Sequence, residues 1–291
     1  MSTKMMFFMF MIRLRRGFLL ETLSYLFGID TATVSRYCHF VGFVISCQLR
    51  TPDDGGLSYF RIRKGDELES MTPERTKAWK KHWIHKYYRK WFKTVENMYE
   101  QVGERDDINS HLDVHSYDCS YLYMHRPQDY DFQKRVYCDN KKRCVVKVAT
   151  INACNGYFED FVLGPGSFSD SRLWNHTTWT EKLEEIVFES GLKTGVGIVM
   201  DKGMDSLNFE CPLIQKVSPT KKKRGIDKTR DEVGIAFEIS SSRISIEQSY
   251  ARMKSLRLLS KTLSMHDLPY LNDYVSCALY FCNTIYKPQT K

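Results

Sequence analysis

Three segments in the middle of the chain alternate between apolar and polar residues, at 116–125, 143–153 and 156–164. Turn-forming residues at 139–140 and 155–156 separate them. Alternation with a period of two, rich in β-branched and aromatic residues, is typical of strands, and short turns join neighbouring strands into hairpins. The sequence therefore predicts a three-stranded meander, and such a sheet needs a further layer to cover its apolar residues.

Helix-forming sequence follows the meander and can provide that layer. Helices are predicted to begin near Ser169 and Thr180, and a short apolar strand at 196–200 comes next. Two further helices are predicted over 240–258 and 268–284. Strands that alternate with helices after a meander indicate an α/β fold, with a mixed sheet flanked by helices.

The first 45 residues are predicted to be helical. Gly28-Ile29-Asp30 joins two helices at 19–27 and 31–41, since glycine permits a tight turn and Asp30 can accept hydrogen bonds at the start of the second helix. This is the pattern of a helix-turn-helix, whose second helix would enter a DNA major groove. The residues expected to face the groove are Thr31, Thr33, Ser35, Arg36 and His39. Two helices joined by a short turn also occur in many helical domains, so a purely structural role stays open.

A turn-rich sequence at 51–56 marks a boundary after this helical region. A long helix is predicted over 72–102, and its aromatic and basic run at 77–93 can contact phosphates and stack on bases. Alternatively, the aromatic residues form the buried stripe of an amphipathic helix and the lysines form its solvated face. The basic run at 221–224 is a nuclear import signal, a DNA contact or a solvated loop.

Charge and composition narrow the class of protein. The chain has 43 Lys and Arg against 35 Asp and Glu, and the resulting charge of +8 suits a nucleic-acid partner as well as an ordinary basic enzyme. The 42% share of hydrophobic residues excludes global disorder, and the longest apolar run, at 5–12, is too short for a membrane helix. Nine cysteines without a CxxC motif argue against a disulfide framework and indicate a reduced, intracellular protein.

Three acidic residues have the positions that a pair of metal ions needs. Asp118 lies within a predicted strand, Asp201 directly follows another, and Glu247 lies on a predicted helix. Mg²⁺ prefers oxygen ligands, and two such ions can activate water and stabilise the leaving oxygen when a phosphodiester bond is cleaved. On that helix Arg243, Glu247 and Lys254 fall within about 40° of one another and form one stripe. Taken singly, each acid also suits a loop cap or a solvated helix face.

Five short motifs occur in an order that resembles a known family. They are DCSYLYMHRP at 118–127, YCDNKKRCVVKV at 137–148, LGPGSFSDSRLW at 163–174, VMDKGM at 199–204 and RISIEQSYARMK at 243–254. In this order, with 82 and 45 residues between successive acids, they resemble DDE-superfamily endonucleases of the PIF/Harbinger transposase type. Those proteins also carry an upstream helix-turn-helix, and the resemblance covers roughly residues 6–285 except for 47–110.

The resemblance implies an RNase H-like catalytic domain with a triad of Asp118, Asp201 and Glu247. These three side chains would hold divalent metal, Mg²⁺ or Mn²⁺, and would cleave DNA. The resemblance also implies that a freed 3′ end is then transferred to a target strand. Asp113 competes with Asp118 for the place of the first acid, but the spacing to Arg-Pro at 126–127 favours Asp118, and the odd offset places the two on opposite faces of the strand.

Four other residues are expected to support the site. Arg243 and Lys254 are expected to contact phosphate or to orient Glu247, and Lys147 is a further candidate for positioning the substrate. Asp170 matches an acid that is typical of the family but is not one of the three metal ligands. We expect Asp170 to cap the helix that follows it, with a place near the metals as the alternative.

These predictions divide the chain into four regions. They are a helix-turn-helix at 1–46, a basic helical linker at 47–110, an RNase H-like nuclease domain at 111–260, and a C-terminal helix at 261–291 that packs on the nuclease domain.

The predicted protein is nuclear, binds double-stranded DNA as a homo-oligomer, has no membrane partner, and works with or without an accessory DNA-binding protein. The alternative function is a catalytically inactive, domesticated or decayed transposase that binds DNA or protein, because the chain begins so close to the helix-turn-helix that upstream DNA-binding elements are expected to be absent.

Overall fold

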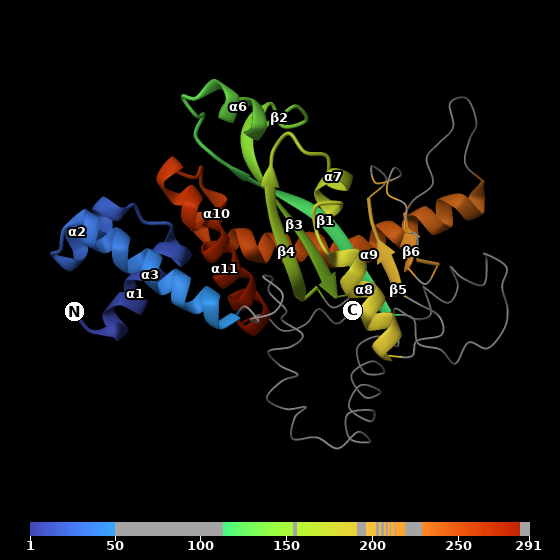
Figure 1. Ribbon diagram of the computed structural model, residues 1–291, viewed down its shortest axis with the longest axis horizontal. Helices are drawn as coiled ribbons and strands as arrows, with labels where there is room; N and C mark the ends of the chain where they lie inside the picture. Colours follow the sequence, from blue (N-terminus) through green and yellow to red (C-terminus); the bar gives the residue numbers. More distant parts are fainter. Residues whose placement is uncertain are drawn as a thin grey trace, which may run out of the picture.

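The computed structural model describes residues 1–49, 113–153, 156–190, 196–201, 204, 207, 209, 211–212, 214–218 and 229–285 (Figure 1). The helix predicted over 72–102, with its basic and aromatic run, lies outside these residues. The basic sequence at 221–224 also lies outside them.

The sheet is built on the predicted meander. Its three long strands, β1 (Asp113–Tyr123), β3 (Arg143–Ala153) and β4 (Phe158–Pro165), run antiparallel, and β3 pairs with both of the others. On its other side β1 pairs in parallel with β5 (Val196–Val199), and β5 pairs in parallel with β6 (Ile214–Val217). An antiparallel meander continued by parallel strands in one mixed sheet confirms the predicted α/β, RNase H-like fold.

The sequence did not predict β6 or two other short elements, α6 (Tyr130–Val136) and β2 (Tyr137–Cys138). Asp129 caps α6 by accepting a hydrogen bond of 2.6 Å from the Phe132 amide, and β2 pairs with the first residues of β3. Elements this short contain too few residues to show a periodic pattern.

One face of the sheet is covered by α7 (Asp170–Trp174) and α8 (Trp179–Ser190), close to the predicted starts of both helices. Trp174 and Trp179 pack edge-on against the buried ring of Tyr117 in β1, with ring centroids 5.0 and 5.7 Å away. These aromatic contacts hold the two helices against the residues of β1 that point toward this face.

The opposite face is covered by α9 (Arg230–Ser255), which begins ten residues before its predicted start (Figure 1). Ile246 and Met253 of α9 are fully buried and share a core with Leu122 of β1 and Val148 of β3. Because neighbouring residues of a strand point to opposite faces, even-numbered residues of β1 such as Leu122 face α9, whereas Tyr117 faces α7 and α8.

The chain continues through α10 (Arg257–Ser260) and η2 (Met265–Tyr270) into α11 (Leu271–Ile285). In Figure 1 α11 lies between the N-terminal helices and the sheet. It contacts α9 and β4 on one side and α3 on the other. The last described helix therefore lies between the N-terminal helices and the sheet, and it contacts both.

The N-terminal region consists of α1 (Thr3–Arg16), α2 (Leu20–Phe27) and α3 (Thr31–Leu49). The predicted turn is present, since Gly28 has a φ of +64° and ends α2, and Asp30 accepts a hydrogen bond of 2.8 Å from the Thr33 amide at the start of α3. The α3 helix runs eight residues past its predicted end at 41. Among the described helices, none is both long and apolar enough to cross a membrane.

The N-terminal helices share a core with the C-terminal helices. Phe10 of α1 stacks on Tyr274 of α11 with ring centroids 6.0 Å apart. Beside them, the guanidinium of Arg13 makes a hydrogen-bonded ion pair of 2.5 Å with Asp267 of η2, and both side chains are buried. The helix-turn-helix is thus packed against the C-terminal helices rather than standing apart from them.

His39 of α3 does not face outward as predicted. His39 was expected to face DNA, but its ring stacks on Tyr270 of η2 with centroids 3.4 Å apart. Burial lowers the pKa of His39 to about 4. The expectation for His39 is therefore wrong, because this face of α3 packs against the C-terminal segment.

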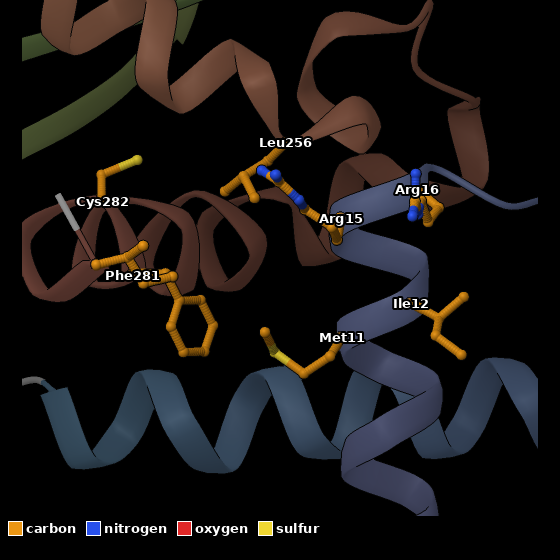
Figure 2. Close-up of a pocket in the computed structure, with 8 residues that line it drawn as sticks. Met11, Ile12, Arg15, Arg16, Leu256, Phe281 and Cys282 are labelled. Carbon is orange, nitrogen blue, oxygen red and sulfur yellow. The ribbon is translucent and has the colours of Figure 1, made fainter.

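A cavity of about 420 Å³ lies at the junction of α1 with α10 and α11 (Figure 2). It is lined by Met11, Ile12, Arg15, Arg16, Leu256, Phe281, Cys282 and Ile285. Met11 and Phe281 point toward one another in Figure 2, and Arg15 and Arg16 are the two charged residues of the lining. None of the predicted catalytic residues lines this cavity.

The buried ion pair between the two ends of the chain gives a stability prediction. Replacing Arg13 with Met should leave the Asp267 carboxylate buried without its partner and lower the free energy of unfolding by about 3 kcal/mol. Chemical denaturation of the full chain measures this change. Arg16→Met, three residues later and exposed, is the matched control and should change the free energy by less than about 0.5 kcal/mol. Equal effects of the two substitutions would show that the ion pair does not join the two regions.

Candidate active site

Asp118 and Asp201 lie level with each other, just beyond the point where the parallel pairing of β1 with β5 ends. Ser116 of β1 pairs with Val199 of β5, and each aspartate comes two residues later. In open α/β sheets, ligands bind at the carboxyl ends of the parallel strands. Asp201 lies just past the carboxyl end of β5, and Asp118 lies beside it within β1, which continues to Tyr123. Asp113, the rival for the first acid, pairs with the first residue of β5 and lies at the other end of the same strand pair.

Arg243 of α9 lies between the two aspartates. Its Nη1 donates a hydrogen bond of 2.9 Å to Asp201 Oδ1, and its Nη2 lies 3.5 Å from Asp118 Oδ2. The Arg243 side chain is 19% exposed and that of Asp118 is 21% exposed, so water screens this contact only in part. Two carboxylates from different strands therefore converge on one cation, which offsets their mutual repulsion.

The environment of Asp118 disfavours its ionised form. Burial raises the pKa of this carboxyl to about 6, and the nearby charges of Asp170 and Asp201 act in the same direction. A hydrogen bond of 2.8 Å from the Cys119 amide and the charge of Arg243 oppose this rise. A carboxylate poised in this way gains strongly from a cation, because a positive charge relieves both desolvation and repulsion.

Tyr250 of α9 fixes the backbone at Asp118. Its hydroxyl donates a hydrogen bond of 2.5 Å to the Asp118 carbonyl oxygen and lies 2.8 Å from Thr150 Oγ1 on β3. Burial raises the pKa of Tyr250 well above its usual value, so the hydroxyl keeps its proton and remains a donor. Because Tyr250 comes seven residues after Arg243, this bond also sets how α9 presents Arg243 to the two aspartates.

The third predicted ligand, Glu247, lies one helical turn after Arg243, and its side chain is exposed. Among the residues that the structure describes, no three His, Cys, Asp or Glu side chains come close enough together to hold a metal ion. The structure thus brings together two of the three predicted ligands, Asp118 and Asp201. The assignment of Glu247 as the third ligand stays a prediction.

Lys147 and Asp170 form an ion pair on the face of the sheet covered by α7. The Lys147 ammonium lies 2.7 Å from Asp170 Oδ1, and the Lys147 side chain is only 6% exposed. The Tyr117 hydroxyl donates to the Asp170 carbonyl oxygen at 2.8 Å. Ser169 caps α7 instead, because its hydroxyl accepts a hydrogen bond of 3.1 Å from the Arg172 amide. The expectation that Asp170 caps this helix is wrong, and the contact of Lys147 with DNA stays a prediction.

Cations gather around Tyr121 of β1, beside this ion pair. The Lys147 and Lys141 ammonium groups lie 5.5 and 4.8 Å from the centre of the Tyr121 ring. Lys254, at the end of the α9 stripe, is half-buried, and burial together with the charge of Lys141 lowers its pKa. Lys141 and Lys254 are therefore near enough to repel each other, and an anion placed between them would relieve that repulsion.

The other residues expected to contact DNA lie in the first part of α3. Arg36 is exposed, and its Nη2 donates a hydrogen bond of 2.9 Å to Thr33 Oγ1. Thr31 and Ser35 are partly exposed on neighbouring turns. These four residues are at least partly exposed, and their role in DNA binding stays a prediction.

The residues of the site suit a divalent metal. Asp118 within β1 and Asp201 just past β5 offer hard oxygen ligands, and both already contact one cationic group. Such a pair of carboxylates, together with water and phosphate oxygens, is how Mg²⁺ is commonly held in proteins.

Two family models match the chain. One, described as a DDE superfamily endonuclease, matches residues 117–283, which is more than half of the chain and includes all three predicted acids. The chain belongs to the DDE superfamily of endonucleases. The other model, described as the helix-turn-helix of DDE superfamily endonuclease, matches residues 1–49, which are the residues of α1 to α3. No curated protein and no solved structure was found to match the chain.

Two features of this DDE superfamily member were missed in the sequence. Tyr250 was not assigned a role, although its place seven residues after Arg243 puts it on the same side of the helix. The bridge that Arg243 makes to both aspartates was also not predicted, because sequence spacing gives no distance between side chains on different elements. The pattern indicated only that Arg243 and Glu247 share a helix face.

The raised pKa of Asp118 predicts how stability changes with pH. A folded-state pKa near 6, above the usual value near 4, means that ionisation of Asp118 costs stability as the pH rises from about 4 to 6. Asp118→Asn removes this cost, so without metal the variant should be more stable than the wild type by about 1–2 kcal/mol at pH 8 and nearly equal to it at pH 4. Urea denaturation in EDTA at both pH values measures the difference. A gap that is constant with pH, or largest at pH 4, would contradict the buried environment of Asp118. Asp131→Asn, at an exposed position on α6, is the control.

Proposed function

We propose that this DDE superfamily member is a metal-dependent DNA endonuclease or transposase. It would cleave phosphodiester bonds at transposon ends and then join the freed 3′ end to a target strand. The observation that carries this proposal is the pair of aspartates, Asp118 within β1 and Asp201 just past β5, which enclose one cation between them. The membership of the family and the helix-turn-helix at the N-terminus support it.

Asp118 and Asp201 would bind the metal, and Glu247 would complete the ligand set from α9. Mg²⁺ or Mn²⁺, when bound, would supply an activated water and charge compensation at the leaving oxygen. Tyr250 would hold Asp118 in place through its backbone carbonyl oxygen, so that the carboxylate is oriented before the substrate arrives. The Asp201 side chain is 55% exposed. A DNA phosphate would therefore be able to approach the two acids from the solvent.

The substrate would be double-stranded DNA held by several cationic groups. In α3, Arg36 with the hydroxyl groups of Thr31, Thr33 and Ser35 would enter the major groove. Near the acids, Arg243 and Lys254 would contact the phosphates, and Lys147 would position the substrate together with Asp170. The excess charge of +8 would favour this binding at low salt.

Several broader features also belong to this proposal. The motifs favour the PIF/Harbinger type of transposase. The protein would act on DNA as a homo-oligomer, together with an accessory DNA-binding protein. A protein that cuts chromosomal DNA would act in the nucleus.

A second candidate function is a transposase-derived protein that binds DNA or protein without cutting. One observation favours it: Glu247 is exposed and does not join Asp118 and Asp201 in a three-residue metal cluster among the described residues. In that case the helix-turn-helix and the cations near Tyr121 would still bind DNA.

A nicking assay decides between the two functions. Supercoiled DNA carrying terminal inverted repeats should be nicked by the full chain with Mg²⁺ or Mn²⁺ and left intact in EDTA. Loss of a residue that merely supports a metal ligand typically costs 10–100-fold, so Asp118→Asn should reduce the nicking rate by more than about 100-fold. Asp113→Asn, at the other end of the same strand, is the matched control and should retain activity.

Two results would contradict the assignment. DNA that is bound but not nicked with any divalent metal would favour the inactive protein. Inactivation by Asp113→Asn, with Asp118→Asn still active, would show that the first acid has been misassigned.

A further inference from the structure

We propose that Arg243 is a built-in counter-ion of the metal site. Its guanidinium lies between Asp118 and Asp201, the two acids that would hold a divalent metal, so that metal binding would have to displace it. This inference rests on the proposed function and adds to it a competition between a side chain of the protein and its metal.

The contacts of Arg243 suit a replaceable cation. Only its two terminal nitrogens engage the acids, at 2.9 Å from Asp201 and 3.5 Å from Asp118. Its Nε is buried, and among the described residues it has no hydrogen-bond partner. A guanidinium built into a permanent structural ion pair usually satisfies its donors, because an unpaired buried donor is costly. This guanidinium neutralises the two carboxylates but leaves one of its own donors unpaired.

The two aspartates, in contrast, are attached to rigid elements. Asp118 lies within β1, and the Tyr250 hydroxyl binds its carbonyl oxygen. Asp201 directly follows the buried end of β5, where the Met200 amide donates to the Val217 carbonyl oxygen of β6 at 2.9 Å. The two carboxylates therefore stay close together whether or not a cation lies between them. Without any cation they would repel each other.

The backbone that carries Arg243 is also fixed, so only its side chain has to move. Ile246 and Met253 of α9 are fully buried, and the Ser249 hydroxyl donates to the Gly156 carbonyl oxygen at 2.5 Å. The long, flexible side chain of arginine can turn away without a shift of the helix. Once displaced, the guanidinium would remain beside the site with its planar donors available to a phosphate group.

Competition of this kind lowers the apparent affinity for metal. If only a fraction of the protein has its carboxylates free at any time, the apparent dissociation constant rises by the inverse of that fraction. Removal of the competing side chain should then tighten metal binding even though it removes a residue proposed to contact the DNA. A residue that only supports the fold of the site would have the opposite effect.

The experiment measures Mn²⁺ binding by isothermal titration calorimetry to the full chain without DNA. Arg243→Gln should bind Mn²⁺ at least about fivefold more tightly than the wild type, which is the lower end of typical coupling between two sites. Arg252→Gln, on the same helix and with the same loss of charge, is the matched control and should stay within about twofold of the wild type. The titrations are repeated at 0.5 M salt, where the Debye length is about 4 Å and distant charges are screened. The tighter Mn²⁺ binding of Arg243→Gln should persist there, because direct competition for the carboxylates is not screened.

Thermal unfolding gives a second readout that needs no activity. In EDTA, Arg243→Gln should unfold at a lower temperature than the wild type, because its two carboxylates have lost their counter-ion. Mn²⁺ should then raise the unfolding temperature of the variant by more than that of the wild type. If Arg243→Gln does not fold, Arg243→Lys replaces it. Its compact ammonium lacks the planar fork that Arg243 presents to the two carboxylates, so its metal affinity should change in the same direction.

The outcomes separate this inference from the proposed function. Equal or weaker Mn²⁺ binding by the Arg243 variants, with clear binding by the wild type, would overturn the inference and leave the metal site standing. Absence of Mn²⁺ binding in the wild type and in every Arg243 variant would overturn both.

Discussion

The parallel pairing of β1 with β5 is the constraint from which the site follows. It places Ser116 opposite Val199, and an aspartate follows two residues after each of them. A shift of one residue in this register would turn one of the two side chains to the opposite face of the sheet. The pairing is stabilised by burial, since all residues of β5 are buried between the helical layers. The fold therefore creates the proximity of two like charges, and the chemistry of the site depends on how that repulsion is offset.

The α9 helix links this pair of charges to the rest of the protein. It brings Arg243 to the two carboxylates and anchors Asp118 through Tyr250, while its buried face joins the core that also contains α11. The α11 and η2 segments in turn hold the N-terminal helices through the ion pair of Arg13 with Asp267. Because these contacts are buried, packing sets the position of α3, the helix that we propose reads DNA, relative to the acids. The folded protein would thus fix the distance between the DNA site that α3 binds and the phosphodiester bond that is cleaved at the acids.

The sequence predicted the strands of the meander, the α/β fold and the two aspartates, because alternation and motif order are properties of the chain itself. It did not predict β6, whose four residues show no clear pattern, or the inward turn of His39, which depends on packing against η2. The cap of α7 was assigned to Asp170 rather than Ser169, although both residues can cap a helix. The bridge from Arg243 to both aspartates could not be predicted, because it joins three elements that are far apart in the sequence. The place of Glu247 in the ligand set is still a prediction.

Iron-mediated cleavage of the polypeptide tests the central claim, a divalent metal site between Asp118 and Asp201, most directly. Fe²⁺ bound in place of Mg²⁺, with ascorbate and peroxide, produces radicals that cut the chain next to the ligands. We predict breaks close to residues 118 and 201, suppressed by excess Mg²⁺ and lost in Asp118→Asn. Cleavage confined to other parts of the chain, or breaks at these positions that Mg²⁺ and Asp118→Asn leave unchanged, would contradict the account.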